Sequence, residues 1–117
     1  MKTDLKEKIT IETKVILAEL DITPINYGYR YILFLIPIVI ERLQNYETVE
    51  LNEIYRKIMR TYKKTYNQVN LPIYKAIRVG NYSRTKEIRE YFNTNTKITP
   101  KRLLILIAEK VINQLKL

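Results

Sequence analysis

Apolar residues recur every three or four positions along most of the chain, which is the spacing of one buried helix face. Alternating apolar and polar runs, the pattern of half-buried strands, are few and short. The pattern therefore predicts an all-α protein with five or six helices. No linker, repeat or low-complexity tract divides the 117 residues, so we expect a single helical domain over 1–117.

The first two helices are predicted from about Leu5 to Leu20 and from Pro24 or Asn26 to about Asn45. The second is the most apolar part of the chain, with an unbroken apolar run from Tyr31 to Ile40. This run is far shorter than the roughly 20 residues that cross a bilayer, and Pro37 lies inside it. We therefore expect a core helix, or one covered in part by a second copy or another protein, and no membrane segment.

Four more helical segments follow. Thr48 is expected to start the third helix, and Thr99 to cap the last one, with Pro100 at the first helical position, where a missing amide costs nothing. The polar run 93–97 is predicted as a loop. The predicted helices lie at about 48–63, 66–79, 85–92 and 101–115.

The segments 48–63 and 66–79 have the size and spacing of a helix-turn-helix. Thr65 and Gln68 form a Thr-x-x-Gln capping box, which favours a helix start at Tyr66. Pro72 would then lie inside that helix, where the lost hydrogen bond and the steric clash cost roughly 3 kcal/mol. We therefore expect a turn from Tyr66 to Asn70, followed by a kinked or restarted helix to about Val79.

Composition argues against an enzyme. The chain has no cysteine and no histidine, and Ser83 is its one serine, so the usual nucleophiles, general bases and soft metal ligands are missing. Gly28 and Gly80 are too far apart to form a phosphate-binding loop. We expect no catalytic residue, no metal site and no cofactor.

The charge is concentrated in one segment. The net charge is +9, and no acidic residue occurs between Glu53 and Glu87. The segment is either a solubilising surface or a binding surface for an anionic partner, most simply nucleic acid. Because solvated faces usually mix both signs, we favour the anionic partner. The nine cations of the segment are Arg56, Lys57, Arg60, Lys63, Lys64, Lys75, Arg78, Arg84 and Lys86.

In a helix-turn-helix the second helix enters the major groove and basic residues around it hold phosphates. The spacing of Val69, Ile73 and Ile77 places them in the core rather than against DNA. The candidates for reading bases are Tyr66, Asn67, Gln68, Asn70 and Tyr74. The candidates for phosphate contacts are Arg56, Arg60, Lys63, Lys64, Thr65, Lys75, Arg78, Arg84 and Lys86.

The chain also resembles a known family in several places, in order and in register. Gly28 to Ile32 reads Gly-Tyr-Arg-Tyr-Ile, and matching positions follow at Tyr62, Val69, Ile73, Ala76, Ile77, Val79, Ile88, Phe92 and Ala108 to Lys110. These residues resemble the C-terminal DNA-binding effector domain of stage zero sporulation protein A, a bacterial response regulator. The resemblance implies a fold of six helices, binding of double-stranded DNA and transcriptional control, here without the upstream receiver domain. We also expect a cytoplasmic location.

The departures from this family supply an alternative. Leu33 and Phe34 stand where the family has a charged pair, and Leu71 replaces a polar residue of the recognition helix. These three apolar residues are candidates for a partner interface, so a protein-interaction module, acting as an inhibitor or adaptor on an altered helix-turn-helix, stays open. RNA binding through the tyrosines is a third reading.

Overall fold

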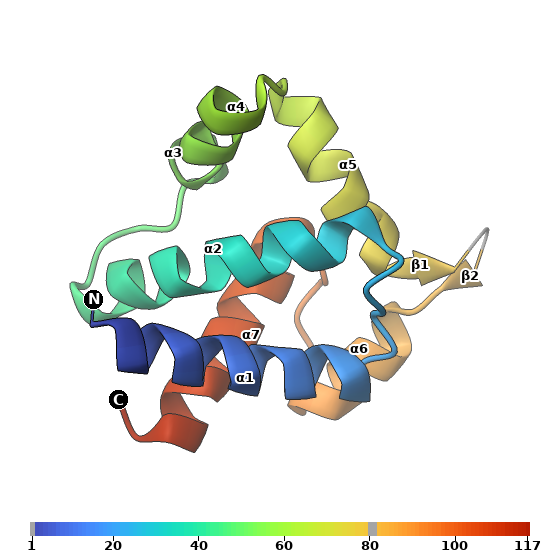
Figure 1. Cartoon of the computed structure of the whole chain (residues 1–117). Helices are drawn as coiled ribbons and strands as arrows, with labels where there is room; N and C mark the ends of the chain where they lie inside the picture. Colours follow the sequence, from blue (N-terminus) through green and yellow to red (C-terminus); the bar gives the residue numbers. More distant parts are fainter. Residues whose placement is uncertain (1, 80–81) are drawn as a thin grey trace.

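The computed structural model describes residues 2–79 and 82–117, and it confirms the all-α class (Figure 1). Tyr55 joins α3 to α4 with right-handed helical dihedral angles, so the two are one helix with a break and the described chain has six helical segments. The elements are α1 (Thr3–Glu19), α2 (Tyr27–Gln44), α3 (Leu51–Ile54), α4 (Arg56–Tyr62), α5 (Tyr66–Ala76), β1 (Arg78–Val79), β2 (Tyr82–Ser83), α6 (Thr85–Phe92) and α7 (Pro100–Leu115).

Helix α2 lies at the centre of the fold and packs against α1, α5 and α7 (Figure 1). This position explains its composition, because a helix contacted on several sides needs apolar residues on several sides. No helix in the described ranges has the length and apolar character needed to span a membrane. The fully buried side chains of α2 are Ile32, Leu35, Ile36, Val39 and Ile40.

The predicted helix starts are confirmed where a side chain caps the helix. The side chain of Thr99 accepts a hydrogen bond from the backbone amide of Arg102 at 3.1 Å, and Pro100 takes the first position of α7. Asn26 caps α2 in the same way through the amide of Gly28. The predicted start of the third helix at Thr48 was wrong, because α3 begins at Leu51.

The expected turn from Tyr66 to Asn70 was also wrong, because α5 runs unbroken through Pro72. The capping box is formed in both directions, with 2.9 Å between the Thr65 amide and Oε1 of Gln68, and 3.2 Å between the Gln68 amide and Oγ1 of Thr65. Val69, Ile73 and Ala76 are buried. Burial of each large apolar side chain contributes about 1.5–3 kcal/mol, so together with the cap it offsets the cost of the proline.

The predicted end of this helix near Val79 needs a correction as well. Helix α5 ends at Ala76, and the chain turns into a two-residue antiparallel ladder that pairs Arg78 with Ser83. The amide of Arg84 donates to the carbonyl of Ile77 at 2.9 Å and closes the base of this hairpin. These cross-strand bonds take the place of another helical turn. The side chain of Val79, a position in the family resemblance, lies outside the described part.

Gly28 sets the closest approach between α2 and α5. A Cβ atom at this buried position would lie 2.5 Å from the backbone oxygen of Pro72, far inside van der Waals contact. The first turn of α2 can therefore rest against the middle of α5 only because residue 28 has no side chain. This contact fixes where α5 lies on the core.

We predict that Gly28→Ala lowers the free energy of unfolding by about 2 kcal/mol, because the added methyl forces the two helix backbones apart. Urea unfolding followed by circular dichroism measures the change. Glu41→Ala, on the exposed side of the same helix, is the control and should change stability by less than about 0.5 kcal/mol. Equal stability of Gly28→Ala and wild type would contradict the close contact.

Candidate nucleic-acid interface

Helices α4 and α5 meet through a tight turn at residues 63–65 (Figure 1). Lys63 adopts the left-handed conformation, with φ 52° and ψ 50°, a position where glycine is usual. The amide of Lys64 then donates to the carbonyl of Met59 at 3.0 Å, and Thr65 caps α5. Backbone hydrogen bonds thus close this turn although it lacks the glycine that turns of a helix-turn-helix often contain.

Tyr55 braces the two helices of this motif from inside. Its side chain is fully buried, and its hydroxyl donates to Oδ1 of Asn70 at 2.7 Å. Its ring lies 5.2 Å from that of Tyr66, with a tilt of 42° between the ring planes. Burial, with a smaller contribution from Tyr66, raises the pKa of Tyr55 well above 10.0, so the phenol stays neutral and remains a donor.

This brace changes the roles of two candidate base-reading residues. Tyr66 and Asn70 are half-buried and contact Tyr55. Tyr55 was missed as a functional candidate, although its spacing from Leu51, Ile54 and Ile58 is that of one helix face and pointed to burial. The other three candidates, Asn67, Gln68 and Tyr74, are exposed.

The solvent-facing side of α5 carries no carboxylate. Oε1 of Gln68 accepts a hydrogen bond from the Thr65 amide. Gln68 can therefore offer a ligand the NH₂ group of its side chain as a donor. Leu71, 50% exposed, gives this face an apolar centre. We call the exposed residues Asn67, Gln68, Leu71, Tyr74 and Lys75 the outer face of α5.

Seven of the nine phosphate-contact candidates lie on α4, in the turn, on α5 or directly after it. Four are exposed cations on α4 or in the turn, and Thr65 is exposed beside them. Arg78, after α5, is half-buried and donates to the Tyr74 hydroxyl at 3.3 Å, with its guanidinium 6.0 Å from the ring centroid. The four exposed cations are Arg56, Arg60, Lys63 and Lys64.

Two further candidates lie elsewhere. The guanidinium of Arg84 donates to the backbone oxygens of Leu20 and Asp21, so it satisfies carbonyls at the C-terminal end of α1. Lys86 is exposed on α6, which also contacts α1 through a hydrogen bond from Tyr91 to Glu19. In Figure 1, α6 lies on the opposite side of the molecule from α3 and α4. The basic segment of the sequence is therefore not one continuous face.

The three candidates for a partner interface do not lie together. Leu33 and Phe34 line a groove of about 680 Å³ between α1 and α2. Leu71 instead borders a smaller hollow of about 250 Å³ with Ile25 and Tyr27. The three apolar residues thus belong to two different surfaces.

No family model, curated protein or solved structure matches the chain significantly. The resemblance to the sporulation effector domain therefore stays a prediction. Within residues 2–79 and 82–117, no group of three or more acidic side chains is placed to hold a metal ion.

We predict that Tyr55→Phe lowers stability by about 1–2 kcal/mol at neutral pH, because Oδ1 of the half-buried Asn70 loses its donor. The difference in the free energy of unfolding between wild type and Tyr55→Phe should shrink as the pH rises above about 10. The folded protein holds the Tyr55 proton at a pH where the unfolded chain releases it. The stability that the neutral Tyr55 phenol contributes is therefore fully present below the pKa of the unfolded chain. It is lost progressively as the pH rises from there towards the pKa of the folded protein.

Urea unfolding of both proteins at several pH values measures this difference. Tyr62→Phe is the matched control: Tyr62 is 57% exposed, so its substitution should leave stability nearly unchanged. A difference between wild type and Tyr55→Phe that stays constant up to high pH would contradict the raised pKa.

Proposed function

We propose that the protein binds double-stranded DNA through α4, the turn at 63–65 and α5, with the outer face of α5 in the major groove. The observation that carries this proposal is the accessibility of that face, which has no carboxylate, includes Lys75 and directly follows the exposed lysines of the turn, Lys63 and Lys64. An α-helix with such a face fits the major groove, where base edges can be read by side-chain amides.

Each part of this surface has a separate task. Lys63, Lys64 and the N-terminal end of α5 attract phosphates, because the helix dipole adds positive charge at that end. The hydroxyl of Thr65 accepts the capping bond and keeps its own proton to donate to a phosphate oxygen. Asn67 is left as the side chain most suited to pair with adenine, since its amide has no hydrogen bond within the described structure.

A regulator of transcription in the bacterial cytoplasm is the role that agrees with the family resemblance. The altered residues of α5 imply a target sequence different from that of the family. Leu71 and Tyr74 present an apolar and aromatic surface, which suits the methyl group of thymine better than a hydrogen-bonding base edge.

We predict that the affinity for a duplex falls steeply with salt. Among the phosphate-contact candidates, those exposed on α4, in the turn and on α5 include the cations Arg56, Arg60, Lys63, Lys64 and Lys75. If these neutralise about five phosphates, the logarithm of the binding constant should fall with the logarithm of salt concentration with a slope of about −4.5. Fluorescence anisotropy of a labelled random duplex at several salt concentrations measures this slope.

A protein that shows no duplex binding at low salt would overturn the proposal. Competition with single-stranded RNA belongs in the same experiment, because preference for single strands would favour RNA binding through the tyrosines. The proposal requires the duplex to compete better.

Two substitutions should separate phosphate contacts from base reading. Lys63→Asn combined with Lys64→Gln removes two charges while asparagine retains the left-handed conformation of the turn. We predict that this double variant binds all duplexes about tenfold or more weakly and lowers the salt slope by about 2. Asn67→Ala should instead change the order of preference among sequences, with a cost of about 1–3 kcal/mol on the preferred site.

Binding selections from a random duplex library, followed by anisotropy on the enriched sequences, measure both effects. Lys8→Gln combined with Lys14→Gln, on the exposed side of α1, removes the same charge away from the motif and is the control. Equal losses in the two double variants would show that only net charge matters and would contradict the assigned surface.

A further inference from the structure

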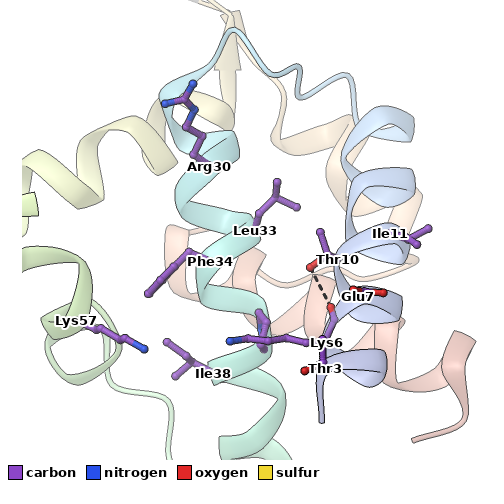
Figure 2. Close-up of a pocket in the computed structure, with 11 residues that line it drawn as sticks. Thr3, Lys6, Glu7, Thr10, Ile11, Arg30, Leu33, Phe34, Ile38 and Lys57 are labelled. Carbon is purple, nitrogen blue, oxygen red and sulfur yellow. Dashed lines mark hydrogen bonds between the residues drawn. The ribbon is translucent and has the colours of Figure 1, made fainter. Parts of the chain in front are cut away.

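A groove of about 680 Å³ lies between α1 and α2, bounded on one side by Lys57 of α4 (Figure 2). Five residues of α1 between Thr3 and Ile11 line it, and five residues of α2 between Arg30 and Ile38. On both helices they occupy positions i, i+3, i+4, i+7 and i+8 of one face. The groove therefore follows two helical turns, a length of roughly 12 Å at the rise of an α-helix.

The floor of this groove is apolar. Leu33, Phe34 and Ile38 are only half-buried, and Ile11 on the facing helix is 63% exposed. Covering apolar surface of this kind is favourable, and the described chain places no further element over it. The apolar floor is poorly suited to phosphates, which separates it from the DNA surface proposed for α5.

The rim of the groove is positively charged. Lys6 from α1 and Lys57 from α4 extend toward one another across the groove beside Ile38, and Arg30 stands at the other end (Figure 2). The ammonium of Lys57 lies 5.6 Å from the Phe34 ring centroid. Glu7 is the one carboxylate in the lining, and within the described ranges neither lysine makes an ion pair. Two like charges that converge without a counter-charge attract an anionic group between them.

We propose that this groove binds an acidic amphipathic helix of a partner protein. Apolar side chains of that helix at i, i+3 or i+4, and i+7 would cover Leu33, Phe34 and Ile38, as in other helix-in-groove complexes. Its carboxylates would lie between Lys6 and Lys57 and next to Arg30.

The same charges argue against a second copy of this chain as the occupant. A symmetric pairing through the groove would bring Lys6, Arg30 and Lys57 of both copies together. The inference goes beyond DNA binding, since it gives the protein a separate site through which a regulatory partner can act.

A display library of helix-forming peptides, with surface positions randomised, tests the proposal. Selection against the whole protein should enrich peptides that combine an apolar i, i+3 or i+4, i+7 stripe with flanking Asp or Glu. Fluorescence anisotropy of a labelled enriched peptide should show binding about tenfold or more weaker to Lys6→Glu combined with Lys57→Glu, and to Phe34→Ala.

The control is Lys8→Glu combined with Lys14→Glu, which makes the same charge change on exposed positions of α1 outside the groove and should leave peptide binding unchanged. Circular dichroism checks that each variant is folded. If Phe34→Ala unfolds, the Lys6→Glu, Lys57→Glu variant still tests the proposal, because both lysines are exposed.

Enrichment of neutral or basic peptides, no enrichment, or equal binding to both lysine double variants would overturn the proposal. Because no DNA is present in this assay, its failure is distinguishable from failure of duplex binding.

Discussion

The contact between the first turn of α2 and the middle of α5 is the constraint on which the rest of the structure depends. Gly28 allows the backbone of α2 to rest on the carbonyl of Pro72, so the two helices cross at close distance. Since α2 also packs on α1 and α7, this crossing ties α5 to the whole core. The direction of the outer face of α5, and hence the proposed DNA surface, follows from it.

A second, smaller constraint acts in the N-terminal half of α5. Tyr55 joins the helix-turn-helix from within, through Asn70 and Tyr66. Amides and tyrosines in a basic segment look alike in sequence, but in the structure some brace the motif and others face solvent. The same holds for the cations: Arg84 satisfies carbonyls of α1, Lys57 borders the groove, and Lys63 and Lys64 surround the start of α5.

The all-α class and the caps at Thr65 and Thr99 could be predicted from the sequence, because capping depends on residues a few positions apart. Thr65 with Gln68 and Thr99 before Pro100 are such local signals. The course of α5 through Pro72 could not be predicted this way, since the energy that offsets the proline comes from Val69, Ile73 and Ala76 packing on distant helices. Likewise, the bonds from Arg84 to Leu20 and from Tyr55 to Asn70 join residues far apart in the chain. Charge and polarity alone therefore assigned Arg84 and Asn70 to a ligand.

An NMR titration of the isotope-labelled protein with a short duplex tests the central claim most directly. The account predicts that, at low salt, amide and side-chain signals of Asn67, Gln68, Leu71, Tyr74 and Lys75 shift, together with those of the turn at 63–65. Signals from α6 and from the groove at Leu33, Phe34 and Ile38 should stay in place. Shifts centred on α6 or on the groove, or no shifts at all, would contradict it.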